Sequence, residues 1–190
     1  MTDHLEPQAW TTRATRTVFR NRWTAVELDR VALPDGREYE YTRLQPAGIG
    51  VGVIGFNRAG EVLLEREYRH GVGEVIWQLP GGLADDGEDL QAAGLRELAE
   101  ETGYRPRIVS PETVRYLGAV WDNPALGPGH SHLFAAWGLE RAVQESPDET
   151  ELLAIRWRSA EWLREAVRSG EIRDRTVIAA VAYLLLNGWL

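Results

Sequence analysis

Three glutamates, Glu97, Glu100 and Glu101, lie in a segment whose apolar residues recur with helical spacing. Because residues three and four apart share one face of a helix, the three carboxylates are expected on one side of one helix. By themselves they would repel one another and weaken that helix. Carboxylate oxygens are the preferred ligands of hard divalent cations such as Mg2+. The spacing therefore indicates either a Mg2+ site or a solvated acidic helix face.

Two adjacent glycines, Gly81 and Gly82, precede this predicted helix. Glycine adopts backbone conformations closed to other residues and lets the main chain approach a ligand closely. Arg96 could bind a carboxylate, most readily that of Glu88, through its fork of N–H donors, which would hold the loop against the helix. Gly94 falls inside the helix, where it costs about 1 kcal/mol relative to alanine. That cost suggests close packing of the helix against a neighbouring element.

The whole stretch 81–104 has the order G-x5-E-x7-R-E-U-x-E-E-x-G-U, where U is a bulky aliphatic residue. The matching positions are Gly82, Glu88, Arg96, Glu97, Leu98, Glu100, Glu101 and Gly103. This order resembles the signature of the Nudix hydrolases. Tyr104 departs from it at the last aliphatic position, a change expected to affect packing more than chemistry.

The resemblance implies roles for the motif residues. Glu97 and Glu101 would bind Mg2+ most directly, with Mn2+ as a possible substitute. Glu100 would share a metal or take part in catalysis, and Gly81 would offer its backbone carbonyl. Three further residues, Gly82, Glu88 and Gly103, would shape the motif, while Arg96 would brace the site, since outer partners fix the orientation of metal ligands.

Composition limits the other possibilities. The chain has 190 residues, 44% of them apolar, and can bury a sizeable core as one domain with a small appendage. Its net charge of −8 argues against general nucleic-acid binding, which needs a basic footprint. The absence of cysteine fits a cytoplasmic protein. The apolar tail 177–190 is too short to span a bilayer, so no membrane association is expected.

The elements around the motif alternate between strands and helices. Residues 15–45 read as three strands with a turn at Pro34-Asp35-Gly36, a unit too small to be stable alone. Further strands are expected at 48–56, 61–70, 113–121 and 131–139. Two helices close the chain, with Ser159 and Asp174 as N-caps and Gly170 ending the first.

The expected fold class is α/β: the resemblance implies a Nudix α/β/α sandwich around a mixed sheet, with a small N-terminal antiparallel β unit. The predicted division is 1–45 for the N-terminal β unit and 46–190 for the hydrolase domain. A homodimer is expected, because both the small β unit and the very apolar last helix ask for a packing surface, which either the main domain or a second chain could supply.

Other features resemble the ADP-ribose pyrophosphatase branch of the family. Arg66-Glu67-Tyr68-Arg69 is similar to its R-Q-Y-R stretch, which places Arg66 and Arg69 near the substrate; ordinary strand-edge charges are the alternative. The loop 122–130 stands where the branch carries a substrate loop, although its usual S-P-G is replaced. Pro124 and His130 are candidate substrate contacts there.

A later acidic loop, 145–151, would by itself be a solvated turn. In this branch an acidic residue of such a loop serves as catalytic base or metal ligand, and the resemblance makes Glu149 the first candidate and Glu151 the second.

The function that follows is metal-dependent hydrolysis of the diphosphate linkage of a nucleoside diphosphate derivative. The leading substrate is ADP-ribose, cleaved to AMP and ribose 5-phosphate. Another nucleotide sugar or dinucleotide, such as GDP-mannose or NADH, is the alternative among enzymes. A Nudix module that binds a nucleotide without cleaving it is the alternative outside enzymes, although the sequence keeps every motif carboxylate.

Overall fold

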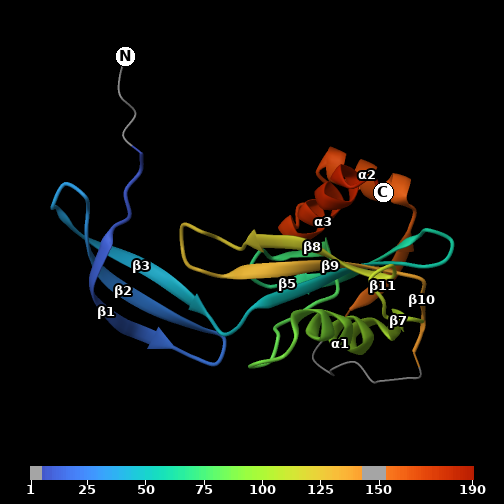
Figure 1. Ribbon diagram of the computed structural model, residues 1–190, viewed down its shortest axis with the longest axis horizontal. Helices are drawn as coiled ribbons and strands as arrows, with labels where there is room; N and C mark the ends of the chain where they lie inside the picture. The colour runs from blue at the N-terminus through green and yellow to red at the C-terminus, as the bar shows by residue number, and fades with distance from the viewer. Residues whose placement is uncertain (1–5, 143–152) are drawn as a thin grey trace, which may run out of the picture. The chain divides into compact units, whose positions relative to one another are not determined.

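The structure is a computed structural model that describes residues 6–142 and 153–190. Its chain divides into two compact units (Figure 1). The first comprises Met1–Ala47 with Asn123–Gly129, and the second comprises Gly48–Asp122 with His130–Leu190.

The first unit is a three-stranded antiparallel sheet in the order β1-β2-β3. Its strands are β1 (Thr11–Arg20), β2 (Thr24–Ala32) and β3 (Glu38–Pro46). The predicted turn between the last two is closed by a hydrogen bond from the Gly36 N–H to the Leu33 carbonyl. The three strands expected in this region are therefore confirmed.

The second unit is built on a mixed sheet of order β11-β5-β4-β9-β8, with β6 added beside β5. Its central strand β4 runs parallel to β9, while the other neighbouring strands pair antiparallel. The strands are β4 (Gly50–Phe56), β5 (Val62–Arg69), β6 (Glu74–Gln78), β8 (Val114–Trp121), β9 (His130–Trp137) and β11 (Ala154–Arg158). A separate pair joins β7 (Tyr104–Pro106) to β10 (Leu139–Arg141).

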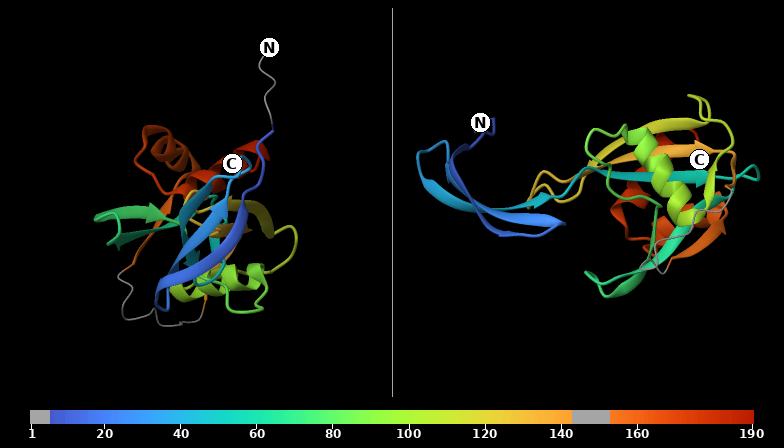
Figure 2. Two further views of the ribbon diagram at one scale, coloured as in Figure 1. Left: turned by 90° about the vertical axis from the view of Figure 1, so that its left-hand side faces the viewer. Right: turned by 90° about the horizontal axis from the view of Figure 1, so that it is seen from below.

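Helices cover both faces of this sheet. Helix α1 (Leu90–Thr102) lies on one face, and α2 (Ala160–Ser169) and α3 (Arg175–Leu186) lie on the other (Figures 1 and 2). The α/β/α sandwich expected from the resemblance is confirmed. The predicted caps are also in place, since Ser159 accepts from the Trp162 N–H and Asp174 from the Thr176 and Val177 N–H groups.

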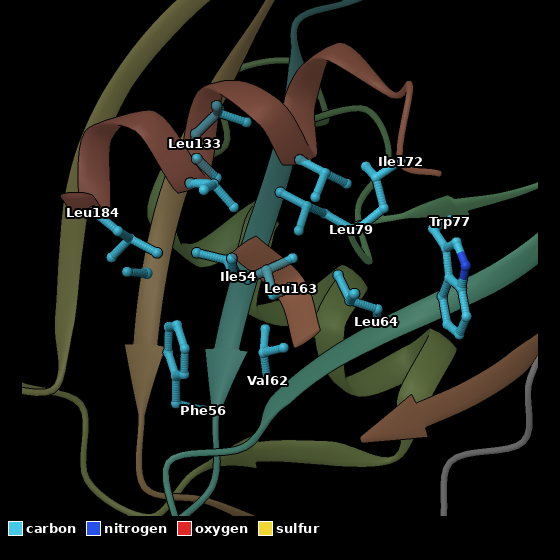
Figure 3. Packing of buried hydrophobic residues seen from close by; sticks show 14 of the residues in the cluster. Ile54, Phe56, Val62, Leu64, Trp77, Leu79, Leu133, Leu163, Ile172 and Leu184 are labelled. Carbon is cyan, nitrogen blue, oxygen red and sulfur yellow. The ribbon is translucent and has the colours of Figure 1, made fainter. Parts of the chain in front are cut away.

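Each face of the sheet has its own apolar core. Ile54 and Leu64 point into the core under α2 and α3, together with Leu163 and Leu184 from those helices (Figure 3). The alternate strand residues belong to the α1 side, in a cluster of Val53, Leu63, Leu98, Val114, Phe134, Ala136 and Leu139. Because strand side chains alternate between faces, Leu63 and every second residue of β5 after it lie on the α1 side.

Strand β6, which is not among the strands predicted from the sequence, forms a hairpin with β5. The expected strands β4 and β5 are both present, and they pair as a hairpin only at its closed end, where Gly55 pairs with Leu63 and Phe56 with Val62. The two strands then diverge, and the motif loop takes the place of β5 beside β4. None of the helices in residues 6–142 and 153–190 combines the length and apolarity that crossing a membrane requires.

Candidate functional site

The glycine loop that precedes α1 is held in line with strand β4. The Val51 N–H donates to the Gly82 carbonyl at 2.9 Å, and the Val53 N–H donates to the Pro80 carbonyl at 3.0 Å. Gly81 lies between these bonds with a φ of 156°, and a Cβ there would stand 2.1 Å from the Val51 carbonyl oxygen. Only glycine leaves room for the strand at this point.

Helix α1 packs closely above the same strand. Asp89 caps its start by accepting from the Ala92 N–H at 2.9 Å. Gly94 faces the sheet, where an added Cβ would lie 3.1 Å from Val53 Cγ2 and 3.5 Å from Phe134 Cδ2. The close packing inferred for Gly94 is thus confirmed, and it brings the helix down onto β4.

Two motif carboxylates face the glycine loop. Glu101 Oε2 accepts a 2.7 Å hydrogen bond from the Gly81 N–H. A Cβ on Gly82 would stand 2.7 Å from the Glu97 carboxyl carbon, so the loop leaves space only for that carboxylate. Glu97 and Glu101 therefore meet the backbone of the loop at successive residues.

Arg96 ties the remaining acids together. Its Nε and Nη2 donate to the two carboxylate oxygens of Glu88 at 3.1 and 3.0 Å, which confirms the pair expected from the sequence. Its Nη1 donates to Glu97 Oε1 at 2.9 Å and to Glu100 Oε2 at 3.0 Å.

This arrangement shifts the ionisation of both partners of the pair. The hydrogen bonds from Arg96, helped by the backbone N–H of Asp85, hold the pKa of Glu88 below its usual value. The carboxylates around it, Glu88 first, hold the pKa of Arg96 above its usual range. Both groups therefore stay charged at neutral pH, and the bidentate pair fixes the loop to the helix.

The residue types fit a magnesium site, although within residues 6–142 and 153–190 no three acidic or histidine side chains converge as a ready cluster. Glu97 and Glu100 are turned to the Arg96 guanidinium, and Glu101 to the Gly81 amide. Carboxylate oxygens from one helix face, beside a loop in which the Glu97 carboxylate fills the space next to Gly82, form a donor set that suits a hard cation.

The two arginines of β5 lie on opposite faces of the sheet. Arg69 alternates with Leu63 and therefore lies on the α1 side, where its Nε contacts Gln78 Oε1 at 2.8 Å and Glu67 Oε2 at 3.0 Å. Arg66 lies on the α2 side, with its guanidinium 5.1 Å from the centroid of the Trp77 ring.

The candidate contacts of the loop 122–130 fall in different units. Pro124 belongs to the first unit. His130 begins β9 in the second, where its ring lies 5.6 Å from that of Trp121 and 5.2 Å from that of His132. Burial, and then the neighbouring His130, lower the pKa of His132. Glu149 and Glu151 lie outside the described residues.

Two polar residues beside the motif were not singled out from the sequence. Glu65 is completely buried in β5, and Gln78 is 6% exposed at the end of β6. Their side chains meet, with Gln78 Nε2 donating to Glu65 Oε2 at 3.4 Å. A glutamate directly after Val62, Leu63 and Leu64 in a strand was the available signal for a buried charge.

Comparison with known families covers most of the chain. The model of the NUDIX domain matches residues 46–181. The model of the nucleoside diphosphate sugar hydrolase N-terminal domain matches residues 10–44.

Several characterised proteins are similar over nearly the full length. A CMP-5'-(N-acetyl-N-hydroxy-3-aminopropyl)phosphonate hydrolase from Streptomyces rubellomurinus is 32% identical over 94% of this chain and 84% of its own. An ADP-ribose pyrophosphatase from Bacillus subtilis is 26% identical over 93% and 92%. A crystal structure of an ADP compounds hydrolase superposes with a TM-score of 0.82 at 22% identity, over 98% of this chain and 100% of that one.

Proposed function

This chain belongs to the NUDIX domain family, and we propose that it hydrolyses the diphosphate linkage of a nucleoside diphosphate derivative, with ADP-ribose as the leading substrate. The products would be AMP and ribose 5-phosphate. The observation that carries the proposal is the meeting of Glu97 and Glu101 with the glycine loop. The resemblance to the family, and to its ADP-ribose pyrophosphatase branch, is confirmed by the matching family models and the Bacillus subtilis relative.

In this proposal Glu97 and Glu101 hold Mg2+, or Mn2+ in its place, with Glu100 and the Gly81 carbonyl as further oxygen donors. The pairing with β4 uses the carbonyls of Pro80 and Gly82 on either side of Gly81. When bound, the ion neutralises charge on the diphosphate and lowers the pKa of a water molecule.

The other motif residues keep the donors in place. Arg96 and Glu88 fix the loop to α1 through their two-pronged contact. Gly103 ends the helix directly after the carboxylates, with a φ of 71° and its N–H donating to the Ala99 carbonyl. A left-handed residue at that position favours glycine.

Substrate contact on the second unit is assigned to Arg69. Its guanidinium lies on the α1 face of the sheet, whereas Arg66 faces α2 and stacks on Trp77. A guanidinium binds phosphate oxygens through several donors at once. His130 and Pro124 remain candidate contacts to the sugar or base, and Glu149, with Glu151 second, remains the candidate base.

One relative favours a second candidate function. The hydrolase from Streptomyces rubellomurinus, whose name gives a CMP-linked phosphonate as its substrate, is 32% identical to this chain, against 26% for the ADP-ribose pyrophosphatase. We therefore infer a cytidylyl-linked phosphonate as the second candidate, ahead of GDP-mannose and NADH. We expect the protein to bind a nucleotide without cleaving it only if the motif carboxylates hold no metal.

A substrate panel tests these alternatives directly. The purified protein is incubated with Mg2+ or Mn2+ and with ADP-ribose, GDP-mannose, NADH or a CMP-linked phosphonate, and the products are separated by chromatography. AMP and ribose 5-phosphate from ADP-ribose, at a higher kcat/KM than for the other compounds, are the expected result. Cleavage of the CMP-linked compound in preference to ADP-ribose would establish the second candidate instead.

We further propose a homodimer in which residues 1–45 form an arm and 46–190 the hydrolase domain. Within the first unit, Phe19 and Leu44 flank Val26 on one sheet face, and they are 52% and 37% exposed. An isolated sheet of three strands needs a packing surface for such a face. Sedimentation at micromolar concentration should give twice the monomer mass of 21.4 kDa, and a fully active monomer would refute the arrangement.

A further inference from the structure

A chain of polar side chains runs along the α1 face of the β5–β6 hairpin. It begins at Glu65, which is completely buried opposite Gln78 in the strand register. It continues through Glu67 to Arg69, the last residue of β5. Gln78 lies three residues before Gly81, or about 10 Å along an extended chain. The series of contacts therefore leads from Gln78, close to the glycine loop in the sequence, to the arginine proposed to bind the substrate.

The charges around Gln78 fix the direction of its amide. Its Nε2 donates to Glu67 Oε2 at 2.6 Å and to Glu65 Oε2 at 3.4 Å. Its Oε1 accepts from Arg69 Nε at 2.8 Å. The reversed amide would set its donors against the guanidinium and its oxygen against two carboxylates. A carboxylate at this position could accept from Arg69, but it would offer no donor to the two glutamates.

The same contacts set the direction of Arg69. Its partner across the strands is Glu74, at the far end of β6, yet its side chain is turned back to Gln78, nearer the glycine loop. Gln78 and Glu67 both contact Nε. A planar guanidinium that is held at Nε keeps its two terminal nitrogens, Nη1 and Nη2, available to bind oxygen anions.

We propose that Gln78 is a positioning residue, whose amide, held by Glu65 and Glu67, orients Arg69 toward an oxygen anion of the bound diphosphate. This inference rests on the proposed function, because it concerns the same substrate. Gln78 acts through Arg69 and affects binding of the substrate rather than the bond-breaking step. A neutral amide suits the role, since it accepts from one cation while donating to two anions.

A double-mutant cycle tests this coupling. Gln78→Met and Arg69→Met, singly and together, are assayed with ADP-ribose and Mg2+. Each single variant should raise KM about ten-fold with kcat within about three-fold of the wild type, because each removes the same contribution, that of a correctly oriented Arg69, to binding of the substrate. The double variant should resemble Arg69→Met alone. If the rise in KM of the double variant equals the product of the rises in the two single variants, the two residues act independently and the proposal is overturned. An unchanged KM in Gln78→Met would overturn it as well.

A second variant covers the possibility that Gln78→Met fails to fold, since it leaves Glu65 without its amide partner. Glu67→Gln keeps the shape of the side chain and the contact between Gln78 and Glu65, but removes the charge beside Arg69 Nε. It should raise KM about three-fold, and the rise should vanish in the Arg69→Met background. The matched control is Glu74→Gln, on the same hairpin, whose carboxylate binds Arg173 and which should leave KM unchanged.

Calorimetric binding of ADP-ribose without metal separates this inference from the proposed function. A wild-type protein that binds ADP-ribose but leaves it intact with Mg2+ would refute the hydrolase assignment. The double-mutant cycle would then be measured as the Kd of ADP-ribose. We expect about ten-fold weaker binding for each single variant and no further loss in the double variant. A wild-type protein that neither binds nor cleaves ADP-ribose would overturn the inference together with that substrate.

Discussion

Gly81 and Glu101 lie 20 positions apart in the sequence and are joined by a 2.7 Å hydrogen bond from the backbone N–H of the glycine to Oε2 of the glutamate. The bond connects the loop that is paired with β4 to the last turn of α1. A carboxylate held in this way is already ordered before any ligand arrives, which lowers the cost of assembling a metal site.

Replacing this carboxylate tests the metal dependence. Glu101→Gln keeps an oxygen acceptor for the Gly81 N–H but removes the charge that a hard cation needs. We expect turnover to fall by roughly 10²-fold or more, as when a key electrostatic contact is lost, while the melting temperature stays close to that of the wild type. Steady-state kinetics and thermal unfolding measure the two effects. Full turnover by this variant, or by the wild type in excess chelator, would refute a metal mechanism.

The two motif glycines should respond differently to the same substitution. In Gly81→Ala the new Cβ would meet the Val51 carbonyl oxygen at 2.1 Å. The backbone of β4 cannot move aside without breaking its hydrogen bonds to the glycine loop. We expect a loss of about 1–3 kcal/mol in the free energy of unfolding. Chemical denaturation measures it, and an unchanged midpoint would contradict the close approach.

In Gly82→Ala the new Cβ would meet the Glu97 carboxyl group, which is the far end of a flexible side chain and can swing away. Stability should therefore change little, while the apparent affinity for Mg2+ should fall about ten-fold because Glu97 is displaced. Titration of activity with Mg2+ measures this affinity. A large loss of stability with unchanged metal affinity would show that Gly82 serves the fold instead.

Local patterns made part of this site predictable from the sequence. Helical spacing placed Glu97 and Glu101 on one face, and the bidentate pair of Arg96 with Glu88 followed from side-chain chemistry. The separation of Arg66 from Arg69 was also available, because residues three apart in a strand point to opposite faces. The resemblance to the R-Q-Y-R stretch does not show this separation, because it groups the two arginines in one motif.

Contacts set by strand register could not be read in the same way. Gln78 meets Arg69 only because β6 folds back on β5 in one particular register. The parallel pairing of β4 with β9 joins segments about 80 residues apart, and no local pattern specifies such a partner. Composition and periodicity thus predicted the helices and the longer strands, while tertiary pairing determined which polar residues lie beside the motif.

The sheet of the first unit should lose stability in acid through a buried carboxylate. Asp29 accepts from Thr15 Oγ1 at 2.6 Å and from Arg43 Nε at 2.9 Å, and these bonds hold its pKa below the usual value. Its contribution is therefore complete above the pKa of the unfolded chain, about 4, and is lost as the pH falls through the lower folded value. Asp29→Asn should cost about 1 kcal/mol at neutral pH and remove this acid-dependent loss.

Hydrogen exchange of the β2 amides between pH 6 and pH 2, corrected for intrinsic rates, measures the effect in this unit alone. Asp35→Asn is the matched control, because Asp35 pairs with Arg37 on an exposed turn, where water screens the charges. Equal effects of the two substitutions would show that burial of Asp29 contributes nothing.

The last prediction concerns the residue that takes the proton from the attacking water. Glu97 and Glu100 are engaged by Arg96, and Glu101 by the Gly81 amide, so each motif carboxylate is already bound by a positive or polar donor. Carboxylates engaged in this way, and needed to hold a cation, are poorly placed to contact the attacking water as a base. A base is better supplied from outside α1, and the acidic segment 145–151 carries Glu149 and Glu151.

We therefore expect Glu149→Gln to lower kcat by roughly 10²–10⁴, the usual contribution of a positioned base, with much smaller changes in KM and in the affinity for Mg2+. Glu151→Gln should have a smaller effect, and Glu100→Gln should act mainly through metal affinity. Steady-state kinetics at saturating Mg2+ separate the three variants, since a lost metal ligand is partly restored by excess metal and a lost base is not. If both loop variants keep near-normal kcat while Glu100→Gln loses it at saturating Mg2+, the base lies in α1 and Glu100 takes the role assigned to Glu149.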